Sequence, residues 1–105
     1  MVIDITKQNI NDIIKNNTLV IIDFYAVWCG PCNSFKPTFE KVSNLFDGRV
    51  LFGSVNIDEY RDIAIKYNVS AIPMLVAIKN SVNCWSHTGT MTEGPLKEKI
   101  ELLLK

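Results

Sequence analysis

The chain lacks an excess of charge of either sign and has no long hydrophobic run. Its 105 residues carry eleven basic and eleven acidic side chains, so the formal net charge is zero. Without a block of like charge we expect neither a nucleic-acid partner nor an anionic membrane partner. Even the chain's longest uninterrupted apolar run, residues 24–29, is far too short to span a bilayer.

The sequence is also poor in cysteine and has no secretory signal at its start. No basic stretch precedes an apolar segment with a cleavage site, so we expect an intracellular protein of the cytoplasm. Cys29, Cys32 and Cys84 are too few for a secreted domain held together by disulfides. An intracellular Cys-x-x-Cys pair near a strand–helix–strand pattern is typical of redox-active thiols.

The composition is that of an ordinary globular protein. Hydrophobic residues make up 48% of the chain and charged residues 21%, which is enough apolar side chain to build a core. We find no linker, repeat or low-complexity segment. The sequence therefore predicts a single domain over residues 1–105, and we expect it to be a monomer.

Hydrophobic periodicity predicts five strands and four helices. The apolar run at residues 19–25, interrupted only by Asp23, is typical of a strand buried on both faces of a sheet. The order predicts an α/β fold, in which parallel strands with helical crossovers are followed by a closing hairpin. The predicted strands cover residues 2–5, 19–25, 50–57, 74–78 and 82–88. The predicted helices follow Thr6, Cys29, Asp58 and Thr92, and we expect Thr6 and Asp58 to cap theirs.

Two cysteines separated by Gly30 and Pro31 directly follow the buried strand, with Trp28 in front of them. Alone, such a pair is compatible with half of a zinc site, a structural disulfide or a reactive thiol pair. The surrounding residues resemble those of the thioredoxin family over nearly the whole chain. The matching features are the Trp-Cys-Gly-Pro-Cys motif at residues 28–32, the buried acid Asp23, the helix proline Pro37, the pair Ile72-Pro73, Gly89 and the order of elements.

The resemblance implies a thioredoxin fold, a mixed five-stranded sheet flanked by four helices, with a cis-proline loop at Ile72-Pro73 facing the cysteines. It implies a dithiol–disulfide oxidoreductase that reduces protein disulfides and contributes to cell redox homeostasis. A thioredoxin reductase would supply the electrons, and client proteins with disulfides would be the substrates. No cofactor is implied beyond the redox-active Cys29–Cys32 disulfide.

We interpret three residues as catalytic. Cys29 precedes a helix start, where unpaired N–H groups and the helix dipole favour a thiolate, so Cys29 is the nucleophile. Cys32, within one turn, resolves the mixed disulfide. Burial raises the pKa of a carboxyl, so we expect Asp23 to accept the proton of Cys32 through a water. A buried Asp that only satisfies a backbone donor is the plainer reading, but the spacing and the resemblance favour the catalytic one.

A second group of residues is expected to contact the substrate. Trp28 can offer a flat apolar surface beside the thiols as well as core packing. A cis bond before Pro73 would expose the backbone of Ile72 to an extended substrate chain. The predicted substrate-binding residues are Trp28, Gly30, Pro31, Ile72, Pro73 and Gly89.

A zinc site is an alternative for the cysteine pair. Cys84 and His87 have ligand spacing and could complete a set of four with Cys29 and Cys32. However, Cys84 and His87 fall on a predicted strand, where a separation of three places side chains on opposite faces. We therefore expect no metal.

Two further alternatives keep the fold and change the activity. A binding module without redox turnover would need neither the cysteine pair nor Asp23. An oxidant or isomerase would more often carry a His between the cysteines, so Gly30-Pro31 favours a reductant.

The chain departs from the family pattern at several positions. Ser54 stands where the family often has a Lys near the buried acid, so Asp23 should experience desolvation with less charge compensation. Met74 stands where the family usually has a Thr, and Asn33 stands where a basic residue is common. We expect Cys84, outside the motif, to be a buried small hydrophobe.

Overall fold

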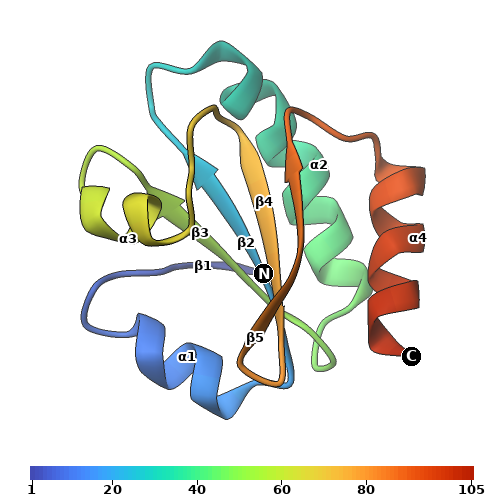
Figure 1. The fold of residues 1–105 in the computed structure, drawn as a ribbon. Coiled ribbons are helices and arrows are strands. Elements are labelled where there is room, and N and C mark those ends of the chain that lie inside the picture. Colours follow the sequence, from blue (N-terminus) through green and yellow to red (C-terminus); the bar gives the residue numbers. More distant parts are fainter.

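The computed structural model describes all residues from 1 to 105 as one sheet between two pairs of helices (Figure 1). The α/β order predicted from the sequence is confirmed, and none of the helices is both long and apolar enough to cross a membrane. The elements are β1 (Val2–Asp4), α1 (Ile10–Asn16), β2 (Leu19–Tyr25), α2 (Gly30–Leu45), β3 (Leu51–Asn56), α3 (Arg61–Lys66), β4 (Met74–Lys79), β5 (Val82–Thr88) and α4 (Glu93–Leu104).

The sheet has the strand order β1-β3-β2-β4-β5, so β2 is its central strand. Strand β3 runs parallel to β1 and β2, whereas β4 pairs antiparallel with β2 and β5. Helices α1 and α3 cover one face and α2 and α4 the other (Figure 1). The predicted two-sided burial of β2 is confirmed, because its first six residues are all buried.

Alternate side chains of β2 enter two separate cores. Val20, Ile22 and Phe24 join the core beneath α1 and α3, while Leu19 and Ile21 join the core beneath α2 and α4. The second core is rich in aromatic rings, supplied mainly by α2 and β3. Burying each such side chain contributes about 1.5–3 kcal/mol, so both helix layers are held by their apolar faces.

Reciprocal hydrogen bonds precede the start of α1. The N–H of Asn9 donates to the Thr6 hydroxyl at 3.2 Å, and the Thr6 N–H donates to the Asn9 side-chain oxygen at 2.7 Å. The N–H of Ile10 also donates to the Thr6 carbonyl at 3.0 Å. These bonds close the turn at residues 6–9 that leads into α1, but the N-cap of α1 itself is Asn9, which makes no side-chain cap bond to the helix. The prediction that Thr6 caps the helix therefore holds only for this preceding turn.

The β4–β5 hairpin closes on Asn80 and Ser81, both of which have positive φ, 51° and 67°. Two successive positive φ values are typical of the type I′ turn that matches the twist of paired strands. Asn68, which follows α3, also has a positive φ of 57°.

Gly53 of β3 lies against Ile5, and this close approach gives a test of the packing. A Cβ on Gly53 would lie 2.3 Å from Cδ1 and 2.6 Å from Cγ1 of Ile5, a side chain that is 1% exposed. We expect Gly53→Ala to lower the free energy of unfolding by about 1–3 kcal/mol because the core is overpacked. Urea denaturation measures this change.

The matched control is Gly94→Ala, because a Cβ at Gly94 meets no atom within 4 Å. We expect this helix substitution to leave stability unchanged or to raise it by up to about 1 kcal/mol. In the double variant with Ile5→Ala the two losses should be less than additive. Additive losses would show that the stability loss of Gly53→Ala does not arise from a clash with the Ile5 side chain.

Candidate active site

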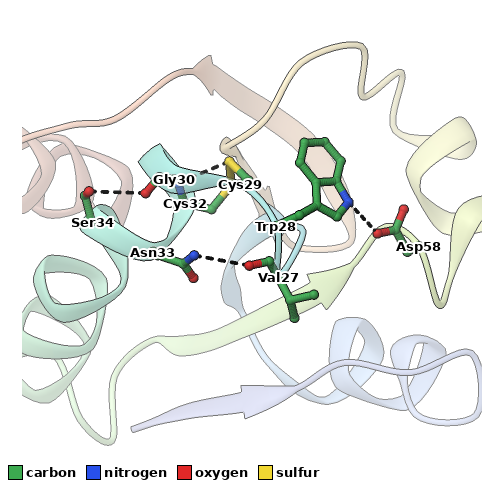
Figure 2. Close-up of a disulfide and its surroundings, with 8 residues drawn as sticks. All are labelled: Val27, Trp28, Cys29, Gly30, Cys32, Asn33, Ser34 and Asp58. Carbon is green, nitrogen blue, oxygen red and sulfur yellow. Dashed lines mark hydrogen bonds between the residues drawn. A yellow bond between two sulfur atoms is a disulfide. The ribbon is translucent and has the colours of Figure 1, made fainter.

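The Cys-x-x-Cys pair lies where β2 gives way to α2. Cys29 and Cys32 form a disulfide with a Cα–Cα distance of 5.3 Å (Figure 2). Both residues are buried, at 5% and 3% exposure, and they pack with Ala26. The structure therefore shows the oxidised form of a vicinal thiol pair.

Cys29 is the N-cap residue of α2, as the sequence predicted. Its Sγ accepts a hydrogen bond from the backbone N–H of Cys32 at 3.2 Å (Figure 2). Pro31 lies in the first turn, where its missing N–H costs nothing. In the reduced protein the same N–H and the positive end of the helix dipole stabilise a thiolate on Cys29.

Asp23 is the buried acid of the site. The residue is 5% exposed, and its Oδ1 has no hydrogen-bond partner. Desolvation by burial raises the pKa of this carboxyl from 3.8 to about 7. At neutral pH Asp23 can therefore either hold or accept a proton, which is the property that a general base requires.

A cleft connects Asp23 with the disulfide. It measures about 310 Å³, and Asp23 and Cys32 both line it. The other polar side chains along its walls are those of Asp4, Tyr25, Asn33, Lys36, Glu40 and Ser54. The cleft between the carboxyl and the second cysteine is thus polar and large enough to admit water.

Trp28 projects from the surface beside the disulfide and is 69% exposed. Its indole Nε1–H donates to Oδ2 of Asp58 at 2.8 Å (Figure 2). The prediction that Asp58 caps the third helix is wrong, because α3 begins at Arg61 after the uncapped Tyr60. The carboxylate is held by Trp28 instead, a partner 30 residues away in the chain.

The loop before β4 completes the site. The Ile72–Pro73 peptide bond is cis, as the resemblance implied, and Ile72 packs against the cluster of Ala26, Cys29 and Cys32. The N–H of Gly89 donates to the Pro73 carbonyl at 2.7 Å. This hydrogen bond joins the end of β5 to the cis-proline loop. Gly89 has φ 99°, a conformation that favours glycine.

Cys84 is exposed, so the expectation that it is buried is wrong. It lies on β5 at the edge of the sheet, next to a register irregularity at Ala77/Ile78, and its Sγ contacts the Ala77 carbonyl at 3.5 Å. An edge strand with a bulge leaves side chains in solvent that a central strand would bury. No three His, Cys, Asp or Glu side chains gather in a way that could hold a metal ion.

Sequence reasoning missed Asp58 and Asn33 as parts of the site. The Asn33 amide donates to the carbonyl of Val27 at 3.2 Å and so fixes the loop before Cys29 (Figure 2). A signal for Asp58 was present, because β2 and β3 are parallel and their carboxyl ends meet at one edge of the sheet. Residues that follow these two ends, such as Trp28 and Asp58, are brought together.

The fold and the disulfide at the start of α2 define a thiol–disulfide oxidoreductase. A sequence model of one family, Thioredoxin, matches residues 1–102. The chain therefore belongs to the thioredoxin family, which confirms the resemblance drawn from the motif.

Known relatives support this assignment. The chain is 32% identical over 98 residues to a putative thioredoxin 2 of Streptomyces coelicolor, covering 93% of this chain and 72% of that protein. It is 37% identical over 92 residues to mitochondrial thioredoxin of Mus musculus, covering 88% of this chain. The chain spans only 55% of the length of that mouse protein.

Solved structures agree. A mutant thioredoxin from Halobacterium salinarum NRC-1 has a TM-score of 0.90 at 27% identity, covering 98% of this chain and 90% of the other. The thioredoxin of Plasmodium falciparum has a TM-score of 0.88 at 32% identity, covering 96% and 98%. The predicted thioredoxin fold is confirmed, and with the Cys29–Cys32 disulfide the protein is a dithiol–disulfide oxidoreductase of the protein-disulfide reductase type.

The buried carboxyl gives a prediction for stability. Since the pKa of Asp23 is about 7 in the folded protein against 3.8 ordinarily, the folded state binds more protons between these values. The free energy of unfolding of the oxidised protein should therefore fall as pH rises from about 4 to 8, by about 4 kcal/mol from this group. Asp23→Asn should remove this fall and be more stable than the parent at pH 8.

Urea denaturation of the two oxidised proteins at several pH values measures the difference. Only the difference between parent and variant reports on Asp23, because other groups titrate in both proteins. Parallel stability curves from pH 4 to 8 would contradict the elevated pKa.

Proposed function

We propose that the protein acts as a reductant in the cytoplasm, carrying electrons from a thioredoxin reductase to disulfides of client proteins. The observation that carries this proposal is the environment of Cys29 Sγ. Its hydrogen bond comes from a backbone N–H, and the residues between the cysteines, Gly30 and Pro31, bring no cation. Without a cation beside it, the thiolate is stabilised only moderately, so the dithiol remains a good electron donor.

In the proposed reaction, the Cys29 thiolate attacks a client disulfide and one client sulfur leaves as a thiolate. Cys32 then gives its proton to Asp23 and attacks Cys29 Sγ. The Cys29–Cys32 bond forms as the bond to the client breaks, so the client gains two electrons and the protein loses two. The short connection between the two cysteines and the cleft shared by Cys32 and Asp23 support these roles.

The substrate surface in this proposal is the apolar rim around the disulfide. Trp28 is exposed yet held by Asp58, so it offers a fixed flat contact. Across the cysteines the cis-proline loop presents backbone that can pair with an extended client chain. The proposed contact residues are Trp28, Gly30, Pro31, Ile72, Pro73 and Gly89.

The reductase would return the protein to its dithiol form by the reverse exchange. We propose a monomer that meets both partners through the same surface, since regeneration and client reduction use the same Cys29 sulfur. The balanced charge supports brief encounters rather than attachment to nucleic acid or membrane.

A redox titration against a series of dithiothreitol buffers, with the Cys29–Cys32 state read by mass, tests the proposal. We expect a reducing potential of about −270 mV, as is usual for thioredoxins. A potential near about −120 mV, typical of strong oxidants, would move the protein to the oxidant or isomerase class.

Cysteine variants test the assigned roles. Cys29→Ser should abolish reduction of a protein disulfide such as that of insulin, because the nucleophile is lost. Cys32→Ser should accumulate a mixed disulfide between Cys29 and the substrate, because no second thiol resolves it. Non-reducing electrophoresis and mass spectrometry detect the trapped species.

The control is Cys84→Ser, which removes the exposed thiol outside the motif. This variant should reduce insulin at the rate of the parent. Retention of full activity by Cys29→Ser would rule out the mechanism.

A further inference from the structure

Three strands place polar side chains in one row across the sheet. The parallel registers pair Ser54 of β3 with Asp4 of β1 on one side and with Asp23 of β2 on the other. Residues paired in register point to the same face of a sheet. All three line the cleft under α2, so the row runs from the exposed Asp4 to the buried Asp23.

Ser54 is the polar neighbour of Asp23 within this row. On the other side β4 pairs Asp23 with Leu75, which is apolar and fully buried. Neighbouring strands lie about 4.8 Å apart, so a hydroxyl and a carboxyl in register can be joined directly or by one water. Asp23 Oδ1 has no protein partner, which leaves it open to a water of this kind.

The same cleft contains Cys32, the residue whose proton must be moved. A water held by the Ser54 hydroxyl would therefore touch both the donor and the acceptor of that proton. The charged and titratable groups that face Asp23 are Asp4 from β1, Tyr25 from β2, Lys36 and Glu40 from α2, and, beyond Leu75, His87 from β5.

We propose that Ser54 is a positioning residue, whose hydroxyl holds the water that links Cys32 to Asp23 and supports the ionised form of Asp23. The inference rests on the proposed function, because it concerns the step that resolves the mixed disulfide. In that step the proton of Cys32 passes through the water to the Asp23 carboxylate. The Cys32 sulfur then bonds to Cys29 Sγ, and the substrate leaves as a thiolate.

The role of Ser54 predicts a change in pH profile. A hydrogen bond to a carboxylate favours its ionised form, so removing the hydroxyl should raise the pKa of Asp23 further. If the midpoint rises by about one pH unit, about one tenth of Asp23 is ionised at pH 7 instead of about one half. The resolving step of Ser54→Ala should then be about five-fold slower at pH 7 and should approach the parent rate at high pH.

The experiment uses the reduced full chain in a Cys84→Ser background, so that the exposed thiol does not react. Mixing with one equivalent of 5,5′-dithiobis(2-nitrobenzoate) in a stopped-flow instrument releases two coloured thiolates in sequence. The first release reports attack by Cys29 and the second reports resolution by Cys32. Rates of both phases are measured from pH 5 to 9.

Ser54→Thr keeps the hydroxyl, and Ser86→Ala removes a hydroxyl from an exposed position of β5 outside the cleft. We expect Ser54→Ala alone to slow the second phase and move its midpoint upward, with the first phase unchanged. A Ser54→Ala profile equal to that of Ser86→Ala would overturn the inference. Equal slowing in Ser54→Ala and Ser54→Thr without a shift in midpoint would also overturn it, since packing would then explain the effect.

Failure of the proposed function has a different result. If the parent with Cys84→Ser released no second thiolate, Cys32 would not resolve the mixed disulfide. Both the proposed function and the role of Ser54 would then fall. If the parent releases the second thiolate normally and Ser54→Ala does not change that phase, only the inference about Ser54 is overturned.

Discussion

The burial of β2 on both faces is the constraint from which the rest of the structure follows. A strand that is apolar on both sides must lie at the centre of a sheet with helices above and below it. The core residues of β2 divide accordingly between the α1–α3 layer and the α2–α4 layer. The chain leaves this strand at its carboxyl end, so the start of α2, with Cys29 as its cap, is held over the edge of a rigid sheet. The redox site thereby takes its position from a strand that is buried on both faces.

Much of this could be predicted, and the errors have physical causes. The bounds of β2 and β5 agreed with the pattern, because continuous burial and alternation are local signals. The order of strands in the sheet depends on contacts that are distant in sequence. The residues of a short apolar strand do not indicate which strand it will pair with. Asp58 was misassigned because its partner, Trp28, is distant in sequence and only the parallel β2–β3 pair brings the two together. Cys84 was misplaced because apolar character does not distinguish an edge strand from a central one.

The site combines an exposed aromatic side chain with buried sulfurs. Trp28 is 69% exposed while Cys29 is 5% exposed, so little sulfur surface meets the solvent. Under the proposed function, a partner must therefore bring its own disulfide against the surface, and its contact with Trp28 and the cis-proline loop would precede exchange. In that proposal, partners would be selected by chain shape and by access to the disulfide, because the apolar rim carries few groups that would recognise one particular sequence.

Asp23 breaks the rule that buried polar groups have partners, and the location of the exception is informative. A carboxyl with an unpartnered oxygen inside a core costs stability, which is why such groups are rare. A full complement of hydrogen bonds to this carboxylate would lower its pKa and leave it a poor base at neutral pH. A buried apolar residue would be more stable but could accept no proton. In the arrangement present here, beside a polar cleft, burial raises the pKa of Asp23 to about 7, a value at which a carboxyl can take up and release protons at neutral pH. The two well-packed cores on either side of β2 make this local cost tolerable, so the stability of the fold and the chemistry of the site are linked through a single strand.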